Sequence, residues 1–149
     1  MKFFEINGQQ LIWRNHGETL VAEPWGEDSI RVRAALMREV KDDRFALLDP
    51  APCPEAEIWI ESERKAFVRN GKITAVLEVC GWKERAKITF LNRKNEVLLQ
   101  ETDGENALIL QARKYEPLPG GAFSLTATFA GQDGERIYGM GQYQEEYLD

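Results

Sequence analysis

Residues that could carry out catalysis are few and widely spaced in this chain. His16 is its sole histidine, so a nucleophilic arrangement of the serine–histidine or cysteine–histidine kind must use it as the base. It lies in Arg14-Asn15-His16-Gly17-Glu18, where we expect a solvated turn between two strands. Because Cys53 and Cys80 lack the spacing of zinc ligands, we predict neither a catalytic histidine nor a metal site.

Two further patterns could carry chemistry. Gly139-Met140-Gly141-Gln142 has two glycines of a dinucleotide-binding loop, but it lacks the third glycine, the preceding parallel strand and the following helix. The chain has 25 acidic residues, so carboxylate pairs are common. Glycoside hydrolysis requires two carboxyl groups at a defined separation across a cleft, and no pair is singled out by its position. We therefore predict no cofactor and no catalytic residue in this chain.

Aromatic side chains are the better candidates for binding, because their rings offer an apolar face to a sugar. Among the four tryptophans, Trp13 and Trp59 lie in expected strands, where burial in the core is favoured. Trp25 and Trp82 lie at turns, Pro24-Trp25-Gly26 and Gly81-Trp82-Lys83, and are candidates for contact with substrate. The alternative for Trp25 is that its ring closes one end of the fold.

Composition limits the class of protein. The 149 residues fit one domain. Because the net charge is −6 and no basic run is present, nucleic acid and anionic membranes are poor partners. A (β/α)8 barrel needs about 250 residues and is excluded. No apolar run approaches the ~20 residues of a membrane span, and the first residues lack the apolar core of a signal peptide. We expect a cytoplasmic protein in which both cysteines are free thiols.

Short alternating segments must position these side chains. Ile73, Ala75, Leu77 and Val79 alternate with mostly polar residues, as in a strand with one buried face. The same pattern is found at residues 30–34, where Arg31 and Arg33 face solvent, and at residues 123–129, where the phenylalanines and Leu125 face the core. Other expected strands lie at residues 10–14, 19–23, 58–61, 66–69, 86–91, 97–100 and 108–112.

The turns between these segments indicate the fold class. Asn70-Gly71 predicts a hairpin whose two central residues both have positive φ. Many short strands at this spacing favour an all-β, antiparallel sandwich with little helix, limited to possible turns at residues 34–43 and 142–148. The proline-rich residues 49–54 are expected to form a loop between two blocks of hairpins.

Two passages are more specific than this pattern. One is residues 18–33, in which a strand, a Pro24-Trp25-Gly26 turn and a second strand end in Arg31-Val32-Arg33. The other is residues 123–129, followed by Gly134-Glu135-Arg136-Ile137-Tyr138-Gly139-Met140-Gly141-Gln142. Together they resemble the N-terminal domain of glycoside hydrolase family 31, which contains α-glucosidases and α-xylosidases. The resemblance covers most of the chain.

The resemblance implies a β-sandwich similar to galactose mutarotase, followed by a catalytic (β/α)8 barrel in the same polypeptide. Two barrel aspartates hydrolyse α-glycosides with retention in this family, in keeping with closely spaced carboxylates. The chain stops at Asp149, before any such barrel, so no residue here inherits a catalytic role. We expect residues 1–149 to be one inactive domain that supports the barrel and walls part of the sugar site. Gln142 and Tyr143 join Trp25 and Trp82 as candidates for contact with an α-linked oligosaccharide.

Two other functions stay open. One is a free-standing carbohydrate-binding module in which Trp25, Trp82 or Tyr143 stacks on a sugar. The other is a mutarotase-like enzyme acting alone, which is disfavoured because that chemistry needs a positioned acid and base. A truncated sandwich also leaves an exposed sheet edge, through which we expect self-association.

Overall fold

A computed structural model describes residues 2–42, 47–102 and 111–136 of the chain. These residues form eleven strands and a single 3-10 turn, and the strands confirm the expected all-β class. In chain order the elements are β1 (Phe4–Asn7), β2 (Gln10–Asn15), β3 (Glu18–Pro24), β4 (Ile30–Leu36), β5 (Glu57–Ser62), β6 (Lys65–Asn70), β7 (Ile73–Cys80), β8 (Arg85–Asn92), β9 (Val97–Gln100), β10 (Arg113–Leu118), η1 (Pro119–Gly121) and β11 (Ala122–Ala127).

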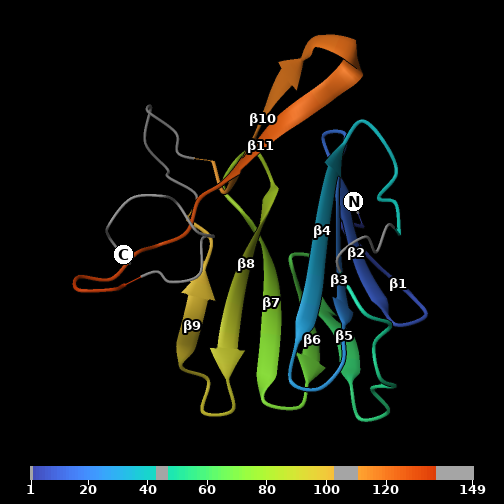
Figure 1. Ribbon diagram of the computed structural model, residues 1–149, viewed down its shortest axis with the longest axis vertical. Helices are drawn as coiled ribbons and strands as arrows, with labels where there is room; N and C mark the ends of the chain where they lie inside the picture. Colours follow the sequence, from blue (N-terminus) through green and yellow to red (C-terminus); the bar gives the residue numbers. More distant parts are fainter. Residues whose placement is uncertain (1, 43–46, 103–110, 137–149) are drawn as a thin grey trace.

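Two antiparallel sheets and a separate hairpin make up the fold (Figure 1). The first sheet has the order β1-β2-β3-β4, the second β5-β6-β7-β8-β9, and β10 pairs with β11. Each sheet follows the chain order, so its strands are joined by tight turns or short loops. The proline-rich residues 49–54 lie in the connection from β4 to β5, as predicted for a loop between two blocks of hairpins.

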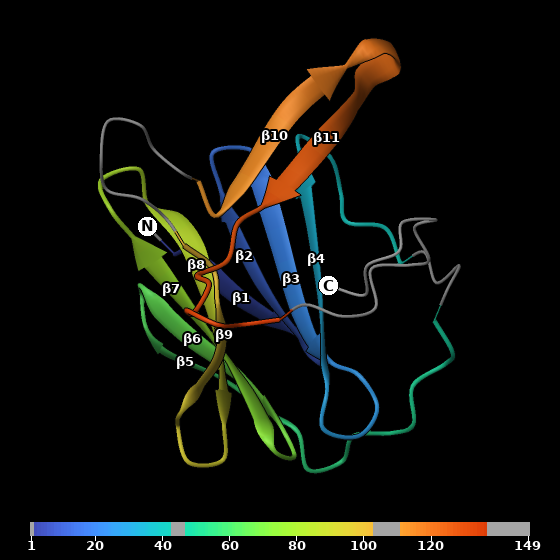
Figure 2. The ribbon, with the colours of Figure 1, turned by 60° about the vertical axis from the view of Figure 1, so that its left-hand side comes forward.

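The two sheets face one another around one apolar core (Figure 2). The alternation predicted for β7 is confirmed, because Ala75, Leu77 and Val79 all lie in this core. Trp13 is fully buried there, as expected. Trp59, also expected in the core, is only partly buried. Its ring stacks on Phe67 with the ring centroids 4.6 Å apart. Phe67 alternates with the buried residues of β6, so this pair covers the outer face of the second sheet.

The hairpin between β6 and β7 is confirmed, but its turn differs from the prediction. Asn70 pairs with Ile73, so the central residues are Gly71 and Lys72, and of these only Gly71 has positive φ, at 58°. The buried amide of Asn70 explains the shift. Its Nδ2 donates to the carbonyl oxygens of Gly26 at 2.7 Å and Ser29 at 2.8 Å, which holds the residue at the end of the strand.

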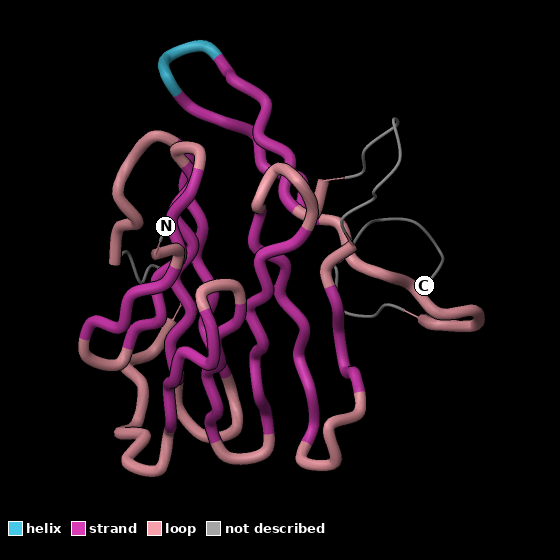
Figure 3. The backbone as a smooth tube through the Cα atoms, turned by 180° about the vertical axis from the view of Figure 1, so that it is seen from behind, coloured by secondary structure: helices cyan, strands magenta, loops and turns pink. Residues whose placement is uncertain are grey.

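Strands β10 and β11 form a hairpin that projects beyond the end of the sandwich (Figure 3). The buried face predicted for residues 123–129 is therefore wrong, since Leu125 is 46% and Phe129 43% exposed. Phe123 is half-buried. Alternation decides which side chains share one face of a strand, but whether another element covers that face depends on the tertiary arrangement.

Several predicted element bounds also need correction. Residues 34–36 continue β4 and residues 37–42 have no helical turn, so the helix expected there is absent from the described part of residues 34–43. The strand expected at residues 108–112 falls mostly outside the described residues, and the following strand β10 was not predicted; nor was β1. The possible helical turn at residues 142–148 also lies outside the described residues.

Candidate functional site

A buried cluster of charged side chains joins the base of the projecting hairpin to both sheets. Arg113, the first residue of β10, donates from Nε to Glu18 Oε1 at 2.6 Å and from Nη1 to Glu101 Oε1 at 2.6 Å. Its Nη2 donates to the carbonyl oxygen of Ala86 at 2.7 Å. Glu101 Oε2 in turn accepts a bond of 2.9 Å from the backbone N–H of Ile88. These bonds fix the point at which the hairpin leaves the sandwich.

The charges of this cluster stabilise each other. Burial alone disfavours the charged guanidinium, but the carboxylates of Glu101 and Glu18 outweigh burial and raise the pKa of Arg113 above its ordinary value. Tyr115 donates from Oη to Glu18 Oε1 at 3.1 Å. Burial, with the negative charge of Glu18, raises the pKa of Tyr115 well above its ordinary value. The phenol therefore remains a hydrogen-bond donor at neutral pH.

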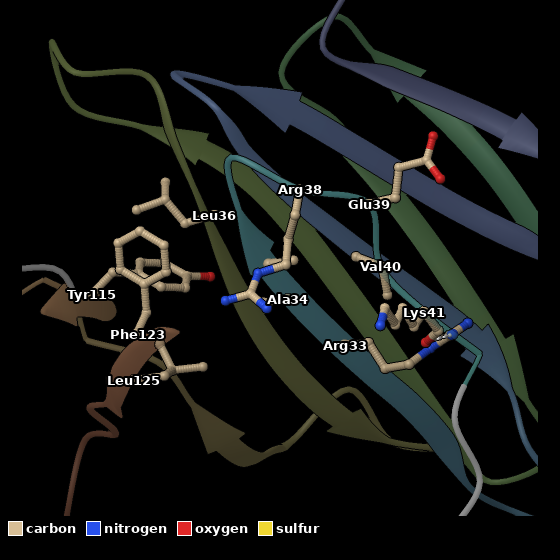
Figure 4. Close-up of a pocket in the computed structure, with 11 residues that line it drawn as sticks. Arg33, Ala34, Leu36, Arg38, Glu39, Val40, Lys41, Tyr115, Phe123 and Leu125 are labelled. Atoms are coloured by element: carbon tan, nitrogen blue, oxygen red, sulfur yellow. Dashed lines mark hydrogen bonds between the residues drawn. The ribbon is translucent and has the colours of Figure 1, made fainter. Parts of the chain in front are cut away.

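Two cavities lie at the hairpin base. The larger is an open hollow with a volume of about 370 Å³, lined by β4, residues 38–41 and the hairpin (Figure 4). The smaller has a volume of about 230 Å³ and is lined by the β2–β3 turn, β8 and the start of the hairpin. Leu36 and Tyr115 line both cavities, so these two side chains form the wall between them.

The larger cavity combines aromatic rings with cationic groups. The rings of Tyr115 and Phe123 meet edge to face, with their centroids 6.4 Å apart. Arg38 extends toward these rings, with its Cζ 5.9 Å from the Phe123 centroid (Figure 4). Lys41 and Arg33 line the same cavity away from the rings. This arrangement suits a ligand that has an apolar face and a negative charge.

The arginines of β4 do not face solvent as predicted. Their side chains are only 8% (Arg31) and 13% (Arg33) exposed. Glu23 Oε1 accepts from Arg33 Nη2 at 2.7 Å, and Asp42 Oδ1 accepts from Arg31 Nη1 at 2.7 Å. The Trp25 ring lies 4.5 Å from Arg31 Cζ. The predicted alternation is correct, but these carboxylates and the indole cover the outer face of the strand.

The smaller cavity contains the only histidine of the sequence. His16 is exposed in the β2–β3 turn, which confirms the predicted solvated position. Trp13 and Arg85 also line this cavity. Within the described residues, Trp13 Nε1 and Arg85 Nη1 are buried without a hydrogen-bond acceptor. Among the described residues, no cysteine lines this cavity beside His16.

The two turn tryptophans lie at opposite ends of the sandwich. The loop of Trp25 contacts the β6–β7 turn through Asn70, whereas Trp82 lies in the β7–β8 turn. Strand β7 separates the two turns, and its eight residues span roughly 26 Å. Arg31 covers the Trp25 ring, while Trp82 is 84% exposed with Lys83 Nζ 5.0 Å from its ring centroid. They cannot stack on one sugar together.

The remaining predicted site residues, Gln142 and Tyr143, lie outside the described residues, as does most of the glycine-containing passage before them. In residues 2–42, 47–102 and 111–136, no three histidine, cysteine or acidic side chains gather as metal ligands would. No helix in the same ranges is long and apolar enough to cross a membrane.

The geometry defines a two-sheet β-sandwich domain whose distinctive surface is an anchored, projecting hairpin with cavities at its base. No family model matches the sequence. The chain is 38% identical over 154 residues to an uncharacterized family 31 glucosidase, ORF2, from Pseudescherichia vulneris, covering 92% of this chain and 28% of that protein. It is also similar to the crystal structure of a GH31 alpha-xylosidase from a soil metagenome complexed with xylose, with a TM-score of 0.83 and 35% identity.

That structural match covers 98% of this chain and 23% of the alpha-xylosidase. The predicted resemblance is confirmed: in sequence and in fold, the chain is similar to part of two glycoside hydrolase family 31 proteins, and it is an all-β domain as expected. It spans only about a quarter of the length of either relative, 28% and 23%.

Residues of the hairpin base were missed by sequence reasoning. Arg113 and Glu101 had no pattern to connect them, because they meet only through the tertiary fold. Arg38 was assigned to a helical turn. One local pattern could have indicated strand β10. Arg113 and Tyr115 alternate with the exposed Lys114 and Glu116, as in a strand with one covered face.

Proposed function

We propose that residues 1–149 form the non-catalytic N-terminal β-sandwich domain of a retaining family 31 α-glycosidase, of the α-glucosidase or α-xylosidase type. The domain supports the catalytic (β/α)8 barrel of the same polypeptide and forms part of the wall of its sugar site. One observation carries this proposal. Nearly the whole chain matches a glucosidase and an alpha-xylosidase, yet it covers only 28% and 23% of them, which leaves ample length for a barrel.

The projecting hairpin supports a role in docking. An isolated two-stranded hairpin has little stability of its own, so this one gains from a partner surface. Leu118, the last residue of β10, is 47% exposed on it, and an exposed apolar side chain favours burial in an interface. The barrel is the partner that we propose. The ion cluster at the base gives the hairpin a defined orientation for that contact.

The four residues predicted to contact an α-linked oligosaccharide are Trp25, Trp82, Gln142 and Tyr143, and they differ in how well they are placed. Trp82 is 84% exposed and is the better placed of the two described tryptophans, whereas the ring of Trp25 is covered by Arg31. Gln142 and Tyr143 remain candidates from the family resemblance. Cys53 and Cys80 are free thiols, which supports the cytoplasm as the compartment.

The mass of the native protein tests this proposal first. An antibody raised against this chain is used on a lysate of the source organism, and the captured protein is assayed with α-glucosides and α-xylosides. We expect a band several-fold heavier than 17.1 kDa that hydrolyses one of these substrates, and no turnover by the isolated chain. A native band at 17.1 kDa would refute the proposal.

A free-standing carbohydrate-binding module is the second candidate, and the exposure of Trp82 is the observation that favours it. Titration with maltose, isomaltose and xylosyl oligosaccharides while tryptophan fluorescence is recorded separates the two functions. Saturable quenching that Trp82→Ala abolishes supports the module. Unchanged fluorescence at millimolar sugar rules the module out.

Self-association through a sheet edge is a further part of the proposal. Strand β9 is one edge of the second sheet, and Val97, Leu98 and Leu99 are 50%, 55% and 37% exposed on it. An apolar edge strand with exposed side chains favours pairing with another chain.

A further inference from the structure

We propose that the larger cavity at the hairpin base binds a carboxylated sugar, such as a uronic acid unit of a glycan. The volume of about 370 Å³ lies within the range of about 300–1,000 Å³ that is usual for small-molecule sites. Recognition of the carboxylate is inferred from the cavity itself. The choice of a sugar as the molecule that carries it rests on the proposed function.

The charges lining the cavity leave one positive charge unbalanced. Arg33 is already neutralised, because its guanidinium bonds Glu23 and Asp42. Among the described residues, neither Arg38 nor Lys41 has a carboxylate within ion-pair distance, and the one further charged lining residue is Glu39. Among the described lining residues, the two cations Arg38 and Lys41 and the one anion Glu39 leave a net charge of +1, which matches a single carboxylate.

Arg38 is exposed, and its contact with the Phe123 ring does not use its hydrogen-bonding capacity. Its guanidinium lies over the Phe123 ring, and a cation–π contact restrains the group while leaving its N–H donors free. Figure 4 shows Arg38 and Lys41 on the wall of the cavity that faces Phe123 and Leu125. A planar guanidinium fork can bind a carboxylate through two parallel hydrogen bonds, which is why arginine is the better suited of the two cations.

The opposite wall suits the carbon face of a sugar ring. Tyr115, Phe123 and Leu125 come from the two strands of the hairpin and present aromatic and aliphatic surface to the cavity. Sugars place their C–H groups on such surfaces, while a fully apolar ligand would leave Arg38 and Lys41 without an acceptor. A carboxylated sugar satisfies both walls at once.

Binding of methyl α-D-glucuronide to the isolated chain tests the inference. Amide chemical shifts are followed by NMR during titration, with methyl α-D-glucoside and acetate as comparison ligands. We expect shifts at residues 38–41, 115, 123 and 125 and a dissociation constant on the order of 1 mM, as for a small ligand of about 14 heavy atoms. The neutral glucoside and acetate should each bind about tenfold more weakly.

Variants separate this site from adventitious binding. Arg38→Gln should weaken glucuronide binding about tenfold, whereas Arg14→Gln, an equal charge change on exposed β2, should alter it by less than about twofold. Phe123→Leu removes the ring and should also weaken binding, with the amide spectrum serving to check that the hairpin is folded.

Three outcomes would overturn the inference. Acetate that binds as tightly as the glucuronide means a simple anion site. An acidic peptide such as tetraglutamate that binds more tightly at the same residues means a protein-docking site. Glucuronide binding that Arg38→Gln leaves unchanged places the ligand elsewhere. None of these results bears on the mass of the native protein, so failure here is distinguishable from failure of the proposed function.

Discussion

Asp28 Oδ1 accepts a hydrogen bond of 2.7 Å from the backbone N–H of Lys72, and so joins the β3–β4 loop of the first sheet to the β6–β7 turn of the second. The ammonium group of Lys72 pairs with the other carboxylate oxygen of Asp28. Asn70 adds two bonds to the same loop. These contacts close the end of the sandwich opposite the projecting hairpin.

Gly71→Ala should destabilise the protein more than Gly8→Ala. Both glycines have nearly the same φ, 58° and 57°, so the cost of placing alanine in the left-handed region is similar, about 1–2 kcal/mol. A Cβ on Gly71 would overlap Asp28 Oδ1, whereas one on Gly8 meets nothing within 4 Å. We expect at least about 1 kcal/mol of additional loss at Gly71 in urea unfolding. In an Asp28→Ala background, Gly71→Ala should lose this additional destabilisation, because the carboxylate that the Cβ would overlap is gone. Equal losses of stability for Gly71→Ala and Gly8→Ala would contradict the close approach of Asp28 to Gly71.

Asp28→Asn should lower stability at neutral pH but not in acid. The hydrogen bonds from the side chain and backbone of Lys72 hold the pKa of Asp28 below its ordinary value in the folded protein. Its contribution is therefore fully present above the unfolded pKa of about 3.9 and is lost as the pH falls through the lower folded pKa. Melting temperatures of the two proteins should converge only below about pH 4. A difference that stays constant from neutral pH to acid would show that the carboxylate charge is not involved.

Arg113→Met should be among the most destabilising single substitutions. Removing the guanidinium leaves Glu18 and Glu101 buried and unpaired, with only 11% and 5% of their side chains exposed. The expected loss in urea unfolding is about 3–5 kcal/mol. Arg14→Met is the matched control, because its pair with Glu5 is 57% and 59% exposed and should contribute less than about 1 kcal/mol. Similar losses for both would mean that the cluster does not hold the hairpin.

Tyr115 should resist ionisation in alkali while the protein is folded. Its pKa is raised above the unfolded value of about 10, so its contribution to stability is complete below that pH and is lost as the pH rises through the folded pKa. Tyrosinate absorbance of the native protein, which has four tyrosines, should show one that does not titrate near pH 10–11. Tyr115→Phe should remove that delayed step. An unchanged titration curve in this variant would assign the delay to another tyrosine.

Leu98→Lys should reduce self-association. A lysine on the exposed β9 edge disfavours strand pairing between chains, because its charge would have to be desolvated. Sedimentation velocity at about 10 mg/mL, a concentration chosen to favour edge pairing, should show oligomers for the wild type and fewer for the variant. Leu48→Lys, at a loop residue that is 89% exposed, is the control and should leave the oligomers unchanged. A monomeric wild-type protein would contradict the proposed edge contact.

Local sequence patterns predicted most strands of the two sheets. The alternation of Ala75, Leu77 and Val79 and the turn signal at Asn70-Gly71 act over a few residues, so the hairpins they encode can be read directly. The passages around Pro24-Trp25-Gly26 and Glu135-Arg136 predicted the family, which both relatives support. Even at Asn70, however, the position of the turn was wrong, because distant carbonyl groups bind its side chain.

By itself, the sequence determined the all-β class, most of the strands and the resemblance to family 31, since these depend on the types and spacing of neighbouring residues. Only the tertiary structure decided which side chains meet. Arg113 reaches Glu18 across 95 positions, and Trp25 and Trp82 are held at opposite ends of the sandwich. Residues 123–129 have the alternation of a core strand, yet the hairpin that contains most of them projects from the sandwich (Figure 1). Alternation is a property of one strand, whereas burial and ion pairing depend on what the rest of the chain places against it.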